Sequence, residues 1–463
     1  ILFGAPIILN PIMFIPFVFG GAIIGTLPMF LMHYGWLAKP IFDPPYVGVF
    51  LEGFLTNGDW RSIVVNAVQL ALTVALYMPF FKIMERQAES KLSEAENKFR
   101  IRLLGLIMDN RLNKIRKLIE EKGIDALLIK GKNSKRYIGA LTGSGVYVLI
   151  TKNKAYQIVD GRYIDEADKK TTAFIKKVVP QGLYIPSIIE ILKELNIDKI
   201  SIENQSMTIK EYIALKDANF NITLLTDELG KVRAVKSEDE IRIIRKSCEL
   251  TDEIFAEFIS EIKEGITELE VAALLQFYSM KKGATGMAFE SIVASGERGA
   301  MPHGRPTTKK LKKNEAITID FGIVYEGYQS DMTRTISIGT PPKIIQEIYS
   351  AVLKSQKLAI EGIREGICAS EVDKIARDSI AESGFGDYFT HGLGHGMGLG
   401  DGEVPTLNSR SEDILIEGMV MSCEPGIYIP NVGGVRIEDD IVIENGIGVP
   451  LNKTSKEWII LGE

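Results

Sequence analysis

Apolar residues from position 112 onward follow a helical period and then change to the short runs that are typical of strands. One helix face is predicted from Leu112, Ile115, Leu118 and Ile119. Gly123 is a suitable helix end, residues 126–129 predict a buried strand, and residues 146–150 and 155–159 predict a hairpin. Because helical and strand patterns continue to alternate, we expect a small α/β domain over residues 108–232.

A second pattern begins after this domain. Long amphipathic helices are predicted over residues 238–257, 268–281 and 342–362. The segments between and after them are β-rich and interrupted by glycine turns. Residues 233–463 are therefore expected to form a separate α+β unit.

The front of the chain is apolar in a different way. Residues 1–36 carry no charged side chain, and a second uncharged run covers residues 62–81. About 20 apolar residues suffice to cross a bilayer core, so the second run predicts a transmembrane helix. Prolines and a Gly-Gly pair interrupt the first run and favour broken or re-entrant membrane structure. We expect residues 1–107 to be membrane-embedded, with membrane contact through residues 1–81.

Charge and cysteine content narrow the function classes. The net charge of −6 gives no basic footprint for nucleic acid. Cys248, Cys368 and Cys423 are scattered and show no CxxC spacing. A structural zinc site or a disulfide framework is therefore not expected, and a reducing, cytoplasmic location fits the part after residue 107.

Two aspartates lie in the predicted hairpin AITIDFGIVYEGYQSDMTRTISIG. The turn at Tyr325–Gly327 places Asp320 and Asp331 on one sheet face, about 5–8 Å apart. Carboxylates this close repel one another unless a cation or a proton lies between them. An exposed acidic pair remains the alternative for this hairpin taken alone.

A second hairpin, VMSCEPGIYIPNVGGVRIEDDIVI, repeats the arrangement. Glu424 and Glu438 flank its turn and share one face, and Arg436 is predicted to orient the Glu438 carboxylate. Asp439 and Asp440 follow Glu438 directly, so a solvated acidic run is the alternative for that residue.

Histidines cluster in the stretch THGLGHGMGLGDGEVP. His391 and His395 are four residues apart, but alternate glycines argue against a helix. With the four carboxylates, His395 completes an oxygen-rich set with one nitrogen, which suits Mn²⁺, Co²⁺, Fe²⁺ or Zn²⁺. Five ligands suit two ions that share carboxylates better than one ion.

In order and spacing, the segments ITIDFG, SDMTRT, HGLGHGMGL, EPGIYIP and GGVRIEDD resemble the pita-bread metallopeptidases, aminopeptidase P and Xaa-Pro dipeptidase (prolidase). The resemblance covers residues 108–463. YIGALTGS and VDGRYIDEA resemble the creatinase-like N-terminal domain of that family. The implied fold is α+β, a pita-bread catalytic domain preceded by a creatinase-like domain. The implied activity is hydrolysis of the Xaa-Pro bond in peptides or dipeptides, and a homodimer is expected.

The resemblance also implies roles for individual residues. Asp320 would hold one ion, Asp331 and Glu438 would bridge two ions, and His395 and Glu424 would complete the other site. Mn²⁺ is the first expectation, with Co²⁺ or Zn²⁺ as alternatives. A metal-bridging hydroxide would attack the scissile carbonyl. The implied catalytic residues are Glu424, which transfers the proton, the substrate-side histidines His303 and His391, and Arg436.

The chain departs from the family pattern at two places. Gly402 stands where the family usually has a further histidine, while Glu403 and Pro405 are retained. Glu297 and Arg298 stand where small residues or Asn are common. These departures leave open the choice between aminopeptidase P and prolidase, and they keep a catalytically weak pita-bread binding protein as an alternative.

The apolar front segment has its own resemblance. FGAPIILNPIMFIPFVFGGAIIG and the segment from Pro44 to Phe81 are similar to the C-terminal end of a lactose/cellobiose-type phosphotransferase-system permease. Residues 1–107 are therefore expected to be a permease fragment joined to a peptidase, with Met108 as the peptidase's own start. The rival hypothesis is a membrane transport component that carries the peptidase as a passenger.

Overall fold

The computed structural model describes residues 31, 59–69, 71, 72, 75, 78, 82, 110–171, 173–400 and 402–462. The chain divides into two compact units, Ile1–Ile107 and Met108–Glu463. Residues 61–69 of the first unit are helical. Within the described residues, no helix combines the length and the apolar character that a membrane crossing requires. Nearly all of the predicted membrane segment lies outside the described residues.

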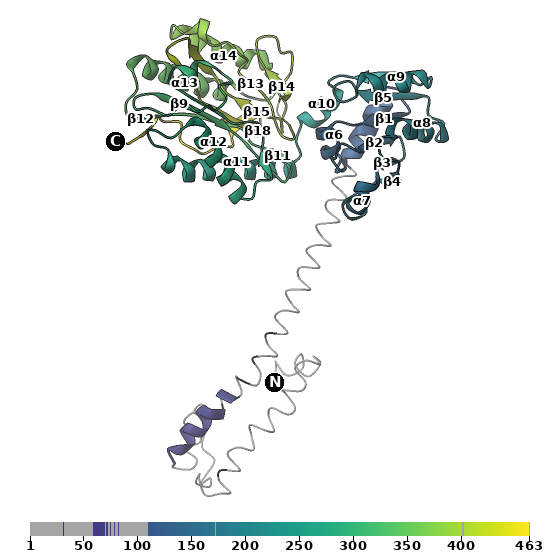
Figure 1. Cartoon of the computed structure of the whole chain (residues 1–463), viewed down its shortest axis with the longest axis horizontal. Coiled ribbons are helices and arrows are strands. Elements are labelled where there is room, and N and C mark those ends of the chain that lie inside the picture. The colour runs from purple at the N-terminus through teal and green to yellow at the C-terminus, as the bar shows by residue number, and fades with distance from the viewer. Residues whose placement is uncertain are drawn as a thin grey trace. The chain divides into compact units, whose positions relative to one another are not determined.

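The second unit begins with a helix over residues 110–121, followed by a six-stranded mixed sheet in the order β4-β3-β2-β1-β5-β6 (Figure 1). Its strands are β1 (Ala126–Ile129), β2 (Val146–Thr151), β3 (Ala155–Val159), β4 (Ile175–Val178), β5 (Lys199–Glu203) and β6 (Asn221–Leu225). Its helices are α6 (Lys132–Tyr137), α7 (Ile164–Lys170), α8 (Tyr184–Glu194), α9 (Ile209–Asp217) and α10 (Glu228–Ala234). The predicted helix face is buried, and Gly123 ends the helix with a φ of +63°. The predicted strand and hairpin are confirmed.

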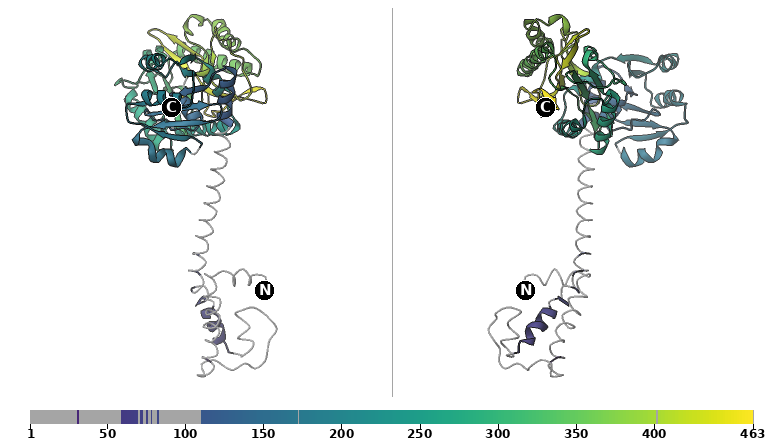
Figure 2. Two further views of the ribbon diagram at one scale, coloured as in Figure 1. Left: turned by 90° about the vertical axis from the view of Figure 1, so that its right-hand side faces the viewer. Right: turned by 60° about the vertical axis from the view of Figure 1, so that its left-hand side comes forward.

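Four long helices frame the remainder of the unit. They are α11 (Glu238–Phe258), α12 (Glu268–Lys281), α13 (Lys343–Gly362) and α14 (Ala369–Glu382). Capping boxes at Ser237 and Thr267 fix the starts of α11 and α12. Each hydroxyl accepts from the backbone N–H of the third helical residue, a glutamate, whose carboxylate accepts from the backbone N–H of the cap residue. The strands lie between the pair α11–α12 and the pair α13–α14 (Figures 1 and 2). The three predicted helices are confirmed.

Two antiparallel-rich sheets occupy the space between the helix pairs, with strand orders β20-β12-β9-β8 and β14-β13-β15-β18-β19. The first comprises β8 (Ile292–Ser295), β9 (Ala316–Phe321), β12 (Met332–Ile338) and β20 (Ile459–Leu461). The second comprises β13 (Gly394–Gly396), β14 (Glu403–Leu407), β15 (Val420–Cys423), β18 (Asp439–Glu444) and β19 (Ile447–Pro450). Smaller sheets contain β7 (Gly286–Met287), β10 (Ile323–Tyr325) and β11 (Tyr328–Gln329), and β16 (Gly426–Ile429) with β17 (Gly433–Arg436).

Both predicted hairpins are present, but neither is continuous. The β9–β12 pairing stops at Phe321 and Met332, and the chain continues as β10 and β11 in another sheet. The second hairpin likewise changes sheet between β15 and β16, and again between β17 and β18. The sequence patterns did not indicate these changes of sheet. Asp331, Glu424 and Glu438 lie at these breaks. Their backbone N–H groups donate to acceptors outside the hairpin's own strand pairing.

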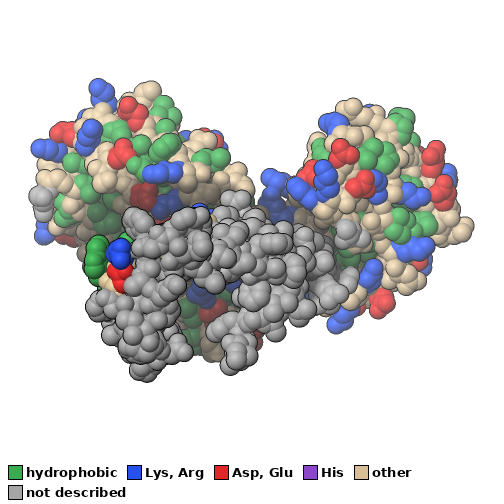
Figure 3. Space-filling model, turned by 90° about the horizontal axis from the view of Figure 1, so that it is seen from below, with side chains coloured by type: hydrophobic (Ala, Val, Ile, Leu, Met, Phe, Trp, Pro, Cys, Tyr) green, Lys and Arg blue, Asp and Glu red, His purple; other side chains and the backbone are tan. Residues whose placement is uncertain are grey.

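The described surface carries side chains of both charges. Lys, Arg, Asp and Glu side chains intermingle on the described part of the face shown in Figure 3. Charges of both signs are dispersed there, which does not favour a nucleic-acid site.

Candidate active site

Three buried carboxylates from distant parts of the sequence meet between the two sheets. Asp320 is the last residue but one of β9, Asp331 precedes β12, and Glu438 lies between β17 and β18. One oxygen from each lies within 4.8 Å of the others. Their exposed fractions are 6%, 7% and 1%, so none is an ordinary solvated acid. The hypothesis of an exposed acidic pair is wrong for Asp320 and Asp331, and that of a solvated run is wrong for Glu438.

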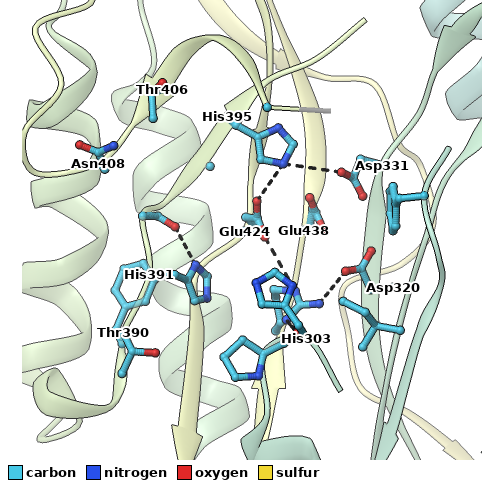
Figure 4. Close-up of a pocket in the computed structure, with 18 of the residues that line it drawn as sticks. His303, Asp320, Asp331, Thr390, His391, His395, Thr406, Asn408, Glu424 and Glu438 are labelled. Atoms are coloured by element: carbon cyan, nitrogen blue, oxygen red, sulfur yellow. Dashed lines mark hydrogen bonds and ion pairs between the residues drawn. The ribbon is translucent and has the colours of Figure 1, made fainter. Parts of the chain in front are cut away.

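His395 and Glu424 border this cluster (Figure 4). The His395 Nε2 atom lies 3.5 Å from Glu424 Oε1 and 3.9 Å from Asp331 Oδ2. The other ring nitrogen, Nδ1, is 3.1 Å from the Gly396 carbonyl. A carbonyl can only accept, so Nδ1 carries the proton in this contact and Nε2 presents its lone pair toward the carboxylates.

Electrostatic repulsion is concentrated at the cluster. Burial, followed by the neighbouring carboxylates, raises the pKa of Asp331 and of Glu438 well above the ordinary range. Burial also raises the pKa of Glu424. Asp331 Oδ1 and Glu438 Oε1 have no hydrogen-bond partner among the described residues. Anionic groups this close need compensating positive charge, from a cation or from a bound proton.

Arg436 contributes part of that charge, but not where the sequence predicted. Its Nη2 donates to Asp320 Oδ2 at 2.6 Å. Toward Glu438 it acts through Thr333, whose Oγ1 accepts from Arg436 Nε at 3.1 Å and donates to Glu438 Oε2 at 2.5 Å. The predicted influence of Arg436 on Glu438 is therefore relayed through Thr333, while the carboxylate to which Arg436 donates directly is that of Asp320.

His391 and Tyr428 continue this polar chain. His391 Nδ1 lies 2.7 Å from the Gly392 carbonyl, so Nδ1 is the donor and Nε2 accepts from the Tyr428 hydroxyl at 2.9 Å. The Tyr428 oxygen in turn accepts from Arg436 Nη1 at 2.9 Å. Burial, followed by the Arg436 charge, lowers the pKa of His391 to about 4. His391 is thus a neutral imidazole at physiological pH.

The cluster opens into a cavity of about 1110 Å³. His303 reaches it from an exposed loop, and the carbonyl of the preceding Pro302 accepts from Arg436 Nη1 at 3.0 Å. Gly402 and Arg410 line another part of the wall. Every residue predicted for the site therefore lines this cavity, and carboxylates, imidazoles and a guanidinium share one solvent-accessible space.

Glycines in the histidine stretch allow the close approach. A Cβ on Gly394 would lie 2.2 Å from the Ser422 carbonyl oxygen, and one on Gly396 would lie 2.2 Å from that of Val404. His395 can therefore lie between strands β14 and β15 without a steric clash. Gly402 is different: its φ is +67°, and a Cβ there would meet no atom within 4 Å.

Sequence reasoning missed four residues that support the site: Ser422, Tyr428, Thr333 and Asp440. Ser422 Oγ donates to Glu424 Oε1 at 3.0 Å and accepts from the His395 backbone N–H at 3.1 Å. Asp440 Oδ2 accepts from the Asp331 backbone N–H at 2.8 Å. A signal existed for Thr333, Ser422 and Tyr428, because each lies an even number of residues from a predicted acid. Asp440 had none.

Comparison with protein-family models gives two matches. Residues 111–246 match the creatinase/prolidase N-terminal domain, and residues 242–445 match metallopeptidase family M24. Neither match includes the front segment, so its permease resemblance stays a prediction.

Individual relatives agree with these matches. A peptidase of Bacillus subtilis is 38% identical over 355 residues, which are 76% of this chain and 100% of that protein. A Xaa-Pro dipeptidase of Pyrococcus horikoshii is 39% identical over 354 residues, 76% of this chain and 99% of that protein.

Solved structures are similar over the same share of the chain. A Xaa-Pro dipeptidase from Bacillus anthracis has a TM-score of 0.74 and 39% identity, covering 76% of this chain and 100% of its own. An X-Pro aminopeptidase from Thermotoga maritima has a TM-score of 0.71 and 35% identity, covering 76% and 99%. Since the chain spans its relatives over their full length and carries their catalytic domain, it belongs to metallopeptidase family M24.

Proposed function

We propose that this protein is an exopeptidase that hydrolyses the Xaa-Pro bond with the help of two divalent metal ions. The observation that carries the proposal is the buried meeting of Asp320, Asp331 and Glu438 beside His395 and Glu424. Relatives named as Xaa-Pro dipeptidases support the substrate class. A catalytically weak binding protein is disfavoured, because all five expected ligands are present and lie together.

The donor set fits two ions of borderline hardness. Asp320 would hold one ion, Asp331 and Glu438 would be shared, and His395 and Glu424 would complete the second site. Carboxylates with one imidazole suit Mn²⁺ first, with Co²⁺ or Zn²⁺ as alternatives. Oxygens that lack partners among the described residues, on Asp331 and Glu438, are available for this purpose.

When bound, such a metal pair polarises the scissile carbonyl and lowers the pKa of a water molecule. Around it, Glu424 is the group that takes up and returns a proton. Ser422 fixes the orientation of the Glu424 Oε1 atom. The proton would finally reach the proline nitrogen, which leaves as a secondary amine.

Three further side chains would bind and orient the substrate. His303 would donate a hydrogen bond to the carbonyl oxygen as its charge develops. Neutral His391, held by Tyr428, would position the peptide next to it. Arg436 would keep Asp320, Thr333 and the Pro302 carbonyl in fixed relation.

Arg410 favours dipeptides as substrates. It lines the cavity, yet the described residues provide no ion-pair partner for its guanidinium. Arg305 and Arg377, the other guanidiniums at the cavity wall besides Arg436, pair with Glu290 and Asp373. A guanidinium without a carboxylate partner is suited to the C-terminal carboxylate of a short substrate.

The test compares metal-loaded enzyme on Xaa-Pro dipeptides and on longer Xaa-Pro peptides. Activity on dipeptides, lost on stripping the metal and restored by Mn²⁺ or Co²⁺, is the expected result. Arg410→Met should raise KM for the dipeptide at least tenfold and leave an amidated dipeptide nearly unaffected. Failure to cleave any Xaa-Pro substrate with metal bound would contradict the proposal.

A further inference from the structure

The segment that carries His303 is held by a carboxylate outside the cavity. Glu268, the first residue of α12, has an exposed fraction of 0% and does not line the cavity. Its Oε1 atom accepts from the backbone N–H of Ser295 at 2.9 Å and from its hydroxyl at 2.8 Å. These contacts fix the point at which strand β8 ends and the His303 segment begins.

The other oxygen fixes the far end of the same segment. Glu268 Oε2 accepts from the backbone N–H of Thr307 at 3.1 Å and from its hydroxyl at 2.7 Å. It also accepts from Arg298 Nε at 3.1 Å, and Arg298 Nη2 donates to the Arg305 carbonyl at 2.5 Å. One carboxylate and one guanidinium therefore join the start, the middle and the end of residues 295–307.

We propose that Glu268, with Arg298, is a positioning unit that sets the place of His303 over the reacting carbonyl. The inference rests on the proposed function for the role of His303, but the contacts themselves do not. Arg298 stands where small residues are common in the family. The proposal gives it a role, because it joins Glu268 to the Arg305 carbonyl.

The physical reason is that His303 itself is exposed, so its position depends on how firmly the backbone on either side of it is held. Hydrogen bonds to a charged acceptor are stronger than neutral ones, and a single buried carboxylate that accepts five restrains two chain segments together. Displacement of a catalytic group by about 1 Å can cost about 100-fold in rate. The expected kinetic effect lies in kcat, because His303 would act on charge that develops in the transition state.

The first test is a double-mutant cycle. Glu268→Gln replaces one accepting oxygen by an NH₂ group that faces donors, so kcat should fall about 10- to 100-fold while KM changes little. In a His303→Ala background the same substitution should change kcat less than twofold, since its effect runs through His303. Effects that multiply independently in the double variant would overturn the proposal.

The second test needs no activity. In metal-loaded full-length protein, amide hydrogen exchange of residues 296–307 should be faster in Glu268→Gln and in Arg298→Met than in the parent. Glu270→Gln is the matched control on the same helix turn, because it contacts Thr267 and not the His303 segment. Its exchange and its kcat should be unchanged.

The outcomes separate the two proposals. If the parent does not cleave Xaa-Pro substrates but amide exchange rises in the variants, the proposed function is contradicted and the positioning unit of Glu268 and Arg298 is supported. If the parent cleaves Xaa-Pro substrates and the amide exchange of residues 296–307 is unaltered in both variants, the positioning unit is overturned. Arg298→Met guards against misfolding of Glu268→Gln, because Arg298 is partly exposed at the surface.

Discussion

At the residue scale, the site consists of buried carboxylates that repel one another unless a cation or a proton compensates their charge. Burial and the neighbouring carboxylates together raise the pKa of Asp331 and of Glu438. Arg436 relieves Asp320 through a direct ion pair at 2.6 Å, and the remaining charge is left for metal. The five expected ligands could be named from sequence because their residue types and spacing are restrictive. Their supporting partners could not, since Thr333 and Asp440 act through contacts more than 100 residues apart.

Asp331→Asn should weaken metal binding and yet stabilise the metal-stripped protein. The folded pKa of Asp331 is raised, so the stability of the stripped protein falls as pH rises above the unfolded value of about 4. Asp331→Asn lacks this penalty. Its free energy of unfolding should therefore exceed that of the stripped parent by an amount that grows from pH 5 to pH 8, on the order of 1 kcal/mol. Thermal unfolding in chelator at both pH values measures it, and a gap that shrinks with pH would contradict the account.

His391 should make the loaded protein sensitive to acid. Its folded pKa of about 4 lies below its unfolded value of 6.5, so the unfolded chain binds the proton first as pH falls. Stability should therefore be present above about pH 6.5 and decrease by about 2 kcal/mol from pH 7 to pH 5.

Urea unfolding of parent and His391→Gln at both pH values checks this expectation. The variant should lose less stability between them. His303→Gln is the control, because His303 lies exposed on its loop and its replacement removes no buried imidazole. Equal losses in the parent and in His391→Gln would count against the assignment.

At the scale of elements, the sequence predicted helices better than sheets. Helix α12 begins and ends at the predicted residues, and α13 begins one residue later than expected. Local signals suffice there, since capping and amphipathic spacing are both carried by neighbouring residues. The hairpins changed sheet at their acids because partners distant in sequence competed for the ladder: the Glu438 N–H donates to Thr333 and the Glu424 N–H to Leu393.

Glycine substitutions in the histidine stretch should separate packing from backbone strain. Gly394→Ala places a Cβ 2.2 Å from a backbone oxygen and should lower the thermal midpoint and abolish metal-dependent activity. Gly402→Ala meets open space at a φ of +67° and should cost only about 1 kcal/mol. Thermal unfolding with kcat/KM measures both, and a larger loss in Gly402→Ala than in Gly394→Ala would refute the distinction.

Gly402→His then tests the departure from the family pattern. The space is open, so the imidazole can be accommodated at the same backbone cost as alanine. An increase in kcat/KM relative to Gly402→Ala would mean that the parent lacks a contributing imidazole. Equal values would show that this position does not limit the rate.

At the scale of the whole molecule, Arg111 links the first helix of the second unit to the catalytic sheets. Its Nη2 donates to the Tyr328 hydroxyl at 3.0 Å and lies 3.3 Å from Glu240 Oε1. Glu240 is buried, so losing its partner leaves a charge poorly compensated. The domain boundaries at residues 107 and 232 and the homodimer remain proposals at this scale, and light scattering of the purified protein tests the latter.

Arg111→Met should destabilise the second unit by about 1–3 kcal/mol with little change in KM. The interaction lost in Arg111→Met lies away from the cavity. It joins the first helix of the second unit to α11 and β11. Thermal unfolding checks the size of the effect. Arg116→Met on the same helix is the control, because among the described residues the Arg116 guanidinium donates a hydrogen bond only to Asn113 of its own helix.

The sequence by itself determined the helices, the acidic and histidine side chains that meet in the cavity, and the family, because those depend on local spacing and on restrictive chemistry. Only the tertiary structure decided that each acidic hairpin is split between sheets, that Arg436 bonds to Asp320, and that Glu268 holds the His303 segment. These features depend on contacts between residues far apart in the chain, such as Glu268 and Thr307 or Arg436 and Asp320. Residue type indicates that such a charge needs a partner, but packing selects which partner it receives.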